Sequence, residues 1–90
     1  RYTKGAHVKN VMAADGCVIE GEVENSILFR GVKIGKGAKV RNCVLMQDTV
    51  IETGAKVEYA ITDKNVTISS YKELKGTDSF PVFVEKHKTV

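Results

Sequence analysis

The fold is decided by the stretch IGKGAKVRNCVLMQDTV (residues 34–50) and the stretch that follows it directly, IETGAKVEYAITDKNVT (residues 51–67). Both begin with isoleucine, and both carry Gly-Ala-Lys-Val at the same place, at residues 37–40 and 54–57. Ile68 then opens a third register at the same spacing of 17 residues. A constant period of this kind indicates a repeat architecture, in which each repeat stacks on the next.

The segment before this pair continues the pattern. Residues 2–10 match residues 34–42, and the spacing is 17 from Tyr2 to Ile19 but only 15 from Ile19 to Ile34. A Val-x-Asn motif recurs in three turns, and a tyrosine replaces its asparagine in the fourth: Asn10, Asn25, Asn42 and Tyr59. We therefore expect four turns of one repeat within residues 1–68.

The spacing of apolar residues within a turn predicts the type of repeat. Large apolar residues fall at positions 34, 40, 46, 51 and 57, in steps of five or six. An amphipathic helix would repeat them every three or four residues, so short strands between tight corners fit better, with three sides per turn. Glycine and asparagine tolerate the left-handed backbone that corners need, and they occur at Gly37, Asn42, Gly54 and Asn65.

Turns of this kind stack at strand spacing, about 4.8 Å apart. Aliphatic side chains then fill the inside, and Lys, Glu and Arg point outward. The sequence therefore predicts an all-β fold, a single-stranded parallel β-helix. Periodicity does not give the sense of coiling.

The two ends of such a coil need covers, because a terminal turn exposes its interior. Residues 69–90 depart from the repeat and carry the only proline, Pro81, before a short expected strand, Val82-Phe83-Val84. We expect these residues to form a C-terminal cap, with contact to another domain or a ligand as the alternative. Because Tyr2 is already in register, we expect an earlier part of a longer chain, or a second copy, to cover the first turn.

The composition excludes several classes of function. The chain has 90 residues, with 14 basic and 11 acidic side chains and a net charge of +3. This charge is too small to indicate a nucleic-acid or membrane partner. No apolar run approaches the roughly 18–20 residues of a membrane span. Cys17 and Cys43 could form one bridge, but two thiols in a reducing compartment fit better, since two cysteines are too few for a disulfide scaffold.

The sequence contains no phosphate loop, no Gly-x-Ser-x-Gly and no Cys-x-x-Cys. His7 aligns with Lys39 and Lys56, which are outward positions, so it is expected on the surface; the alternative is the histidine that hexapeptide acyltransferases use between neighbouring coils. Both cysteines align with small residues and fit structural positions. We predict no catalytic residue and no metal ligand in this chain.

Basic residues are the remaining candidates. Several are expected on nearby turns: Arg30, Lys33, Lys36, Lys39, Arg41 and Lys56. Lys64, Lys86 and Lys88 would approach one another if the tail folds back. Such groups either bind a phosphorylated metabolite or simply solvate the outer faces and suppress pairing at strand edges.

Two stretches, residues 15–38 and 44–66, closely resemble the C-terminal domain of bacterial glucose-1-phosphate adenylyltransferase (ADP-glucose pyrophosphorylase). The shortened turn Ile-Glu-Gly-x-Val-Glu-Asn-Ser at residues 19–26 is specific to that family, and the tail from Leu74 to Val84 is most similar to its D-type regulatory subunit. The resemblance implies a hexapeptide-repeat β-helix, which coils left-handedly. It also implies a cytoplasmic, non-catalytic domain for assembly and allosteric regulation in glycogen biosynthesis.

The resemblance further implies that catalysis belongs to an N-terminal nucleotidyltransferase domain absent from this chain, which joins ATP and glucose 1-phosphate with Mg²⁺. No cofactor is expected here. The implied partners are that domain and other subunits of a homo- or hetero-oligomer, expected to be a tetramer, and a phosphorylated sugar as effector. Two effector-binding positions carry over, Lys64 and Lys86, where relatives have arginine. The alternatives are an acyltransferase acting through His7 and a purely structural solenoid.

Overall fold

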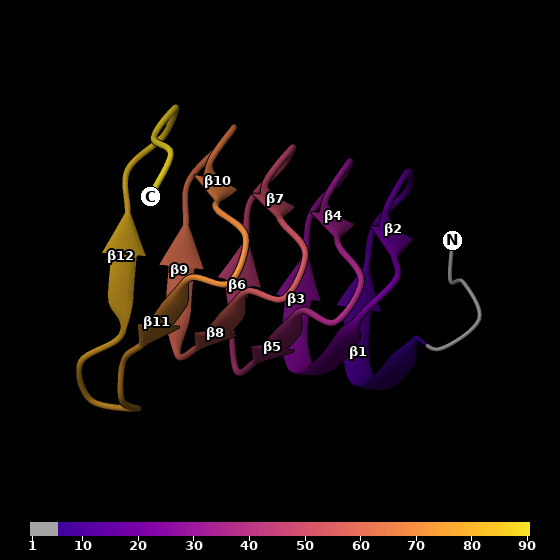
Figure 1. Ribbon diagram of the computed structural model, residues 1–90, viewed down its shortest axis with the longest axis horizontal. Coiled ribbons are helices and arrows are strands. Elements are labelled where there is room, and N and C mark those ends of the chain that lie inside the picture. The colour runs from indigo at the N-terminus through magenta and orange to yellow at the C-terminus, as the bar shows by residue number, and fades with distance from the viewer. Residues whose placement is uncertain (1–5) are drawn as a thin grey trace.

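The computed structural model describes residues 6–90, which form an elongated coil measuring 32 × 23 × 22 Å. The coil is built from short strands that stack along its long axis (Figure 1). The strands are β1 (His7–Ala13), β2 (Val18–Ile19), β3 (Glu22–Leu28), β4 (Lys33–Ile34), β5 (Lys39–Arg41), β6 (Val44–Leu45), β7 (Val50–Ile51), β8 (Lys56–Glu58), β9 (Ala60–Thr62), β10 (Thr67–Ile68), β11 (Glu73–Lys75) and β12 (Val82–Val84). None of the described residues belongs to a helix that is long and apolar enough to cross a membrane.

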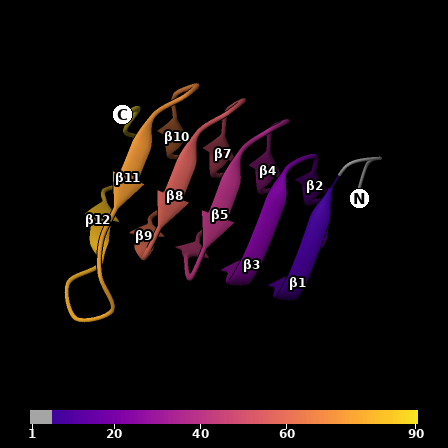
Figure 2. The ribbon, with the colours of Figure 1, turned by 60° about the horizontal axis from the view of Figure 1, so that its bottom comes forward.

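Each circuit of the chain crosses three faces. Face A carries the first halves of β1 and β3, followed by β5, β8 and β11, which lie side by side in Figure 2. Face B carries the second halves of β1 and β3, followed by β6, β9 and β12. Face C carries β2, β4, β7 and β10. All of these pairings are parallel, so the prediction of an all-β parallel β-helix is confirmed.

The core consists of columns in which each side chain sits on its equivalent from the previous turn. On face C the column is Ile19, Ile34, Ile51 and Ile68, each at most 1% exposed. Valines form the corresponding column on face A, and Leu28 pairs with Leu45 on face B. β-Branched side chains suit this arrangement because they pack well on a pleated surface.

One inward position differs from the sequence prediction. The spacing placed residue 46 among the inward apolar residues, but Met46 is only half-buried and Leu45 is fully buried. The reason is the alternation within β6, where Val44 faces outward and Leu45 inward, so that the next residue faces outward again.

The corners are made by residues in the left-handed backbone region, which stack as the strands do. The A–B corner uses Asn10, Asn25, Asn42 and Tyr59, the B–C corner uses Gly16, Gly31, Asp48, Asn65 and His87, and the C–A corner uses Gly37, Gly54 and Tyr71. The four corner residues predicted from the sequence all adopt this conformation. At the A–B corner the side chain of Asn10 also donates a hydrogen bond from Nδ2 to Asn25 Oδ1 at 2.7 Å.

Few polar side chains enter the core, and those that do have partners. Thr49 and Thr62 are fully buried, and their hydroxyl oxygens lie 2.8 Å apart. The Thr49 hydroxyl also reaches the backbone oxygen of Asp63, at 3.2 Å. Ser26 Oγ accepts a hydrogen bond from the backbone N–H of Cys43 and donates one to the oxygen of Glu24. These bonds satisfy groups that would otherwise be costly to bury.

Residues 69–90 add a further, interrupted turn to the coil. β11 pairs with β8 at the usual spacing of 17, but β12 pairs with β9 at a spacing of 22, since Phe83 lies beside Ile61. The additional residues form a loop before β12, closed by backbone hydrogen bonds between Thr77 and Phe80. Val84 is buried, and Thr89 forms a parallel bridge with Thr67 on face C.

Two lysines occupy positions in the last described turn that are inward in the turn before it. Lys72 is in register with Ala55, and Lys88 is in register with Val66, both of which are fully buried. Both lysines are exposed. A charged residue at an inward position disfavours the addition of another strand, so these side chains give the C-terminal end a polar surface.

Candidate functional site

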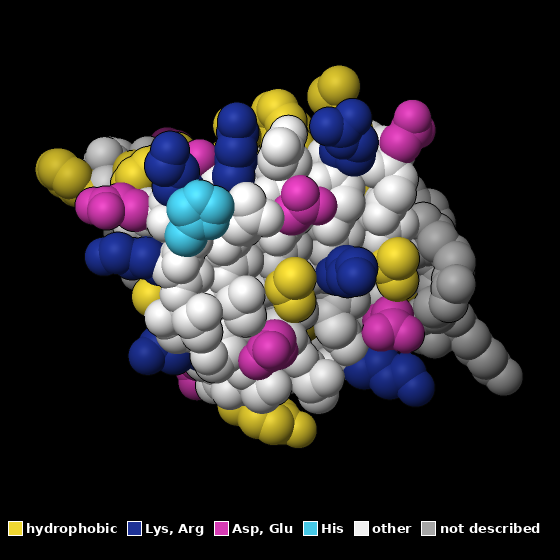
Figure 3. All heavy atoms as spheres, turned by 90° about the horizontal axis from the view of Figure 1, so that it is seen from above, with side chains coloured by type: hydrophobic (Ala, Val, Ile, Leu, Met, Phe, Trp, Pro, Cys, Tyr) yellow, Lys and Arg dark blue, Asp and Glu magenta, His cyan; other side chains and the backbone are white. Residues whose placement is uncertain are grey.

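The predicted effector residues lie at the B–C corner in adjacent turns. Lys64 and Lys86 are register neighbours, because the backbone N–H of His87 donates to the oxygen of Lys64 at 3.0 Å. Lys88 follows directly, and its backbone oxygen accepts from Thr67 N–H at 2.9 Å. We call Lys64, Lys86, His87 and Lys88 the basic corner; all four are exposed. In the view of Figure 3 one histidine side chain lies near several side chains coloured as Lys or Arg.

Carboxylates border the basic corner on the side of face B. Asp63 and Glu85 precede the two lysines in adjacent turns. The Asp63 carboxylate is half-buried, and its Oδ1 accepts a hydrogen bond of 2.7 Å from the backbone N–H of Lys64. This bond fixes the carboxylate against the backbone, while the lysine side chains remain exposed to solvent. The corner can therefore present ammonium groups to an anion.

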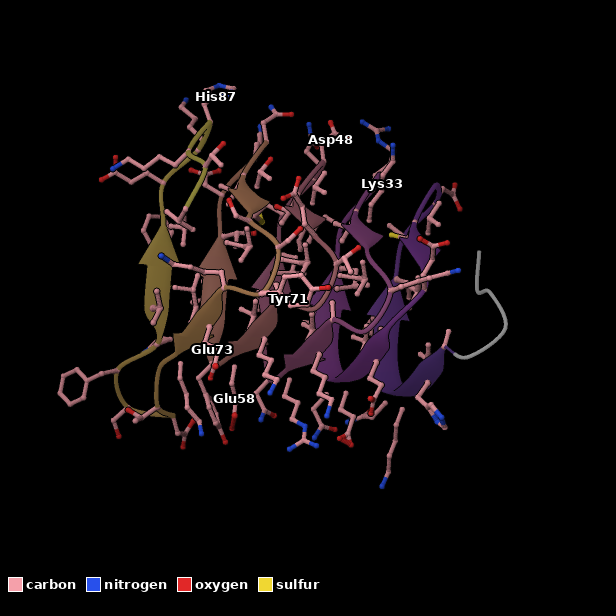
Figure 4. All side chains as sticks on the ribbon, viewed as in Figure 1. Lys33, Asp48, Glu58, Tyr71, Glu73 and His87 are labelled. Carbon is pink, nitrogen blue, oxygen red and sulfur yellow. The ribbon has the colours of Figure 1, made fainter. Side chains whose placement is uncertain are left out.

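The other basic residues predicted as candidates do not form one cluster. Lys39 and Lys56 are neighbours on face A, where Arg41 belongs to a separate column. Lys33 lies on face C, whereas Lys36 and Arg30 lie at the C–A and B–C corners. Lys33 and Asp48 appear along the same edge as His87 in Figure 4, opposite Glu58 and Glu73.

His7 lies on the exterior of face A, as predicted, with Glu22 as its register neighbour in β3. Cys17 and Cys43 are both buried thiols. Burial raises the pKa of the Cys43 thiol to about 11, so this group is protonated at neutral pH and is a poor nucleophile. Within residues 6–90 no three or more His, Cys, Asp and Glu side chains are grouped so as to hold a metal ion.

The exterior of face A is charged. One column carries alternating signs through five turns, in the order Lys9, Glu24, Arg41, Glu58 and Lys75. Arg41 Nε lies 3.5 Å from Glu24 Oε2, and Lys75 Nζ lies 4.0 Å from Glu58 Oε2. These pairs are largely exposed, so each contributes at most about 1 kcal/mol.

The exterior of face B is apolar, which the sequence interpretation missed. One outward column contains only apolar residues through all five turns: Met12, Ile27, Val44, Ile61 and Phe83. We call this column the apolar stripe. Met12, Ile27 and Phe83 are 72%, 43% and 60% exposed. The signal was present in the sequence, at the same place in successive repeats, but it becomes visible only once inward and outward positions are distinguished.

Comparison with known proteins identifies the family. A family model described as GlmU-like, C-terminal hexapeptide matches residues 1–79. The chain belongs to this hexapeptide family. It is 55% identical over 86 residues to the glycogen biosynthesis protein GlgD of Bacillus subtilis (strain 168), a match that covers 96% of this chain and 25% of that protein.

Other relatives include glucose-1-phosphate adenylyltransferases. The enzyme of Corynebacterium jeikeium (strain K411) is 40% identical over 79 residues, which cover 87% of this chain and 19% of that protein. The enzyme of Fusobacterium nucleatum is 49% identical over 39 residues, which cover 43% of this chain and 10% of that protein. The chain thus spans about a quarter or less of these relatives' length. The hexapeptide family and the resemblance to this adenylyltransferase family, both expected from the sequence, are confirmed.

Proposed function

We propose that this chain is a non-catalytic assembly and regulatory domain of an ADP-glucose-forming system in glycogen biosynthesis. The observation that carries the proposal is the similarity to GlgD, which extends over 96% of the chain. The implied partners are a nucleotidyltransferase domain and related subunits, in a homo- or hetero-oligomer for which we propose a tetramer. The ATP and Mg²⁺ of the reaction would bind in that other domain.

We further propose that the basic corner binds a phosphorylated sugar. The support is geometric, because Lys64 and Lys86 occupy the same corner position in adjacent turns, which are about 4.8 Å apart. Two exposed lysine side chains from adjacent turns can direct their ammonium groups to the oxygens of one phosphate or of two phosphates on one small molecule. Lysine acts here as a point charge, whereas arginine would offer a planar fork.

Titration calorimetry with fructose 1,6-bisphosphate as the probe, on the full-length protein, tests the effector site. We expect Lys64→Ala and Lys86→Ala each to weaken binding about tenfold, and added salt to weaken it further. Lys36→Ala is the matched control, since Lys36 is an exposed lysine at the C–A corner. Unchanged affinity in both variants, or an equal loss in the control, would contradict the assignment.

The regulatory role has a separate test. A glucose-1-phosphate adenylyltransferase is assayed for pyrophosphate release with and without the full-length protein. We expect the added protein to change the rate or its response to the sugar phosphate, and to add no rate of its own. An unchanged rate would contradict the role, whatever the calorimetry gives.

A further inference from the structure

We propose that face B binds face B of a second copy of this chain, related by a twofold axis parallel to the coil axis. The proposal deepens the assembly role proposed above and names its partner and geometry. It starts from the apolar stripe, because outward positions on a β-helix are not needed for the core. An apolar column across all five turns therefore needs another cause.

The stripe is broadened by a second outward column on the same face. In successive turns this column contains Ala14, Phe29, Met46, Asp63 and Glu85. Phe29 is 40% exposed, and with Met12 and Ile27 it lines a shallow hollow of about 240 Å³. The face is therefore apolar over its first three turns and acidic on one side over the last two.

The exposed apolar area on face B is large enough for the centre of a dimer interface. The exposed parts of its aromatic, Met and Ile side chains amount to roughly 500 Å². A specific interface buries about 800 Å² per partner, with a polar rim around its apolar centre. The charged residues along the two edges of face B would supply that rim.

The charges along these two edges identify the partner. The A–B edge carries Lys9, Glu24, Arg41, Glu58 and Lys75 in successive turns. The B–C edge carries Asp15, Arg30, Gln47, Lys64 and Lys86 in the same turns. In the first, second and fourth turns the two edges have opposite signs. In the third turn Arg41 lies opposite the neutral Gln47, which is followed by Asp48. In the fifth turn Lys75 lies opposite Lys86, which is preceded by Glu85.

A twofold axis parallel to the coil axis brings the A–B edge of one copy against the B–C edge of the other, turn by turn. Lys9 then faces Asp15 of the second copy, and Glu24 faces Arg30. An axis along the strands would instead set Lys9 against Lys75 and Glu24 against Glu58, which repel. The charge pattern therefore favours one arrangement, in which each stripe residue meets its own equivalent.

Sedimentation equilibrium of the full-length protein tests the apolar centre. We expect concentration-dependent association in which this dimer is one step of the assembly, and Ile27→Glu should weaken that step at least about tenfold, because a charge would be buried without a partner. Lys56→Glu is the control, since it places the same charge at an exposed position on face A. A protein that is monomeric throughout, or a dimer that tolerates Ile27→Glu, overturns the proposal.

Charge exchange tests the orientation. Lys9→Glu and Asp15→Lys should each weaken the dimer several-fold, and the double exchange should restore it, since opposite signs face each other again. A double variant weaker than either single variant overturns the arrangement. If the apolar stripe becomes protected from solvent only when a different protein is added, then face B binds that protein and the proposal of self-pairing is overturned. Loss of the dimer with unchanged binding of fructose 1,6-bisphosphate would refute this inference and leave the proposed effector site intact.

Discussion

Faces A and B belong to the same turns and share one core, yet their exteriors differ in kind. Face A presents alternating Lys, Glu and Arg, whereas face B presents Met12, Ile27, Val44, Ile61 and Phe83. The inward residues of both faces are aliphatic or small because the fold requires it. The outward residues carry no such requirement, so their chemistry reports what each face meets. Apolar side chains indicate a contact on face B, whereas the charged column of face A at its edge suits the polar rim of that contact.

The largest expected effect is the difference in stability between a variant of an inward residue and a variant of an outward residue. Ile51→Ala removes a fully buried side chain from the column on face C and should lower the free energy of unfolding by about 2–5 kcal/mol. Ile27→Ala, at 43% exposure on face B, should cost below about 1 kcal/mol when the protein is monomeric. Urea unfolding at low protein concentration measures both. Equal costs would contradict the assignment of Ile27 to the exterior.

A pH effect is expected beneath face B, where Cys43 is buried. Its pKa is raised from 9.0 to about 11 by burial, so the folded protein keeps the proton longer than the unfolded chain. The stabilisation is therefore complete below about pH 9 and is lost as the pH rises through about 11, by up to about 2–3 kcal/mol.

The comparison is with Cys43→Ala, because alanine occupies the equivalent position in the next turn, at Ala60. The difference in stability between the two proteins should be constant at neutral pH and shrink between about pH 9 and 11. A constant difference across that range would show that the thiol titrates normally. Chemical unfolding at a series of pH values gives the result.

The buried threonine pair gives a smaller, asymmetric effect. Thr49→Val leaves the Thr62 hydroxyl buried without its partner, 2.8 Å away, and should cost about 1–3 kcal/mol. Thr62→Val should cost only about 1 kcal/mol, because Thr49 keeps the Asp63 oxygen at 3.2 Å. Thermal unfolding of the two isosteric variants compares them. The reverse order of stability would mean that the Thr62 hydroxyl is satisfied in another way.

The smallest effect belongs to the exterior of face A. Glu58→Gln removes the pair with Lys75 and should change stability by less than about 1 kcal/mol, since the Lys75 side chain is exposed and the Glu58 side chain is about one-third exposed. The change should vanish in molar salt, where such pairs are screened. Unfolding at low and high salt tests this. A larger loss that persists in high salt would place Glu58 in a buried contact.

Much of this fold could be predicted because its repeats are visible in the sequence. The match of residues 34–50 with 51–67 gave the parallel stacking, and Gly37, Gly54, Asn42 and Asn65 gave four of the left-handed corners. The last turn could not be predicted in the same way. The loop before β12 changes the spacing from 17 to 22, and lysines replace apolar residues at positions 72 and 88.

The candidate sites were predictable to different degrees. Lys64 and Lys86 came from family resemblance, and their adjacency depends on the loop that resets the register of the tail. The left-handed backbone of Tyr59 and Tyr71 has no compositional signal, since tyrosine rarely adopts it. The apolar stripe can be recognised only when every outward residue has been assigned correctly. An error of one residue in that assignment, as at Met46, moves a side chain to the other face of the strand.

Hydroxyl-radical oxidation at increasing protein concentration tests the central claim that copies of this chain meet through face B. Met12 on face B and Tyr71 at the C–A corner are nearly equally exposed, at 72% and 74%. We predict that the oxidation rate of Met12 falls as the protein is concentrated, while that of Tyr71 stays constant. Rates that change in parallel, or a Met12 rate independent of concentration, would contradict the account.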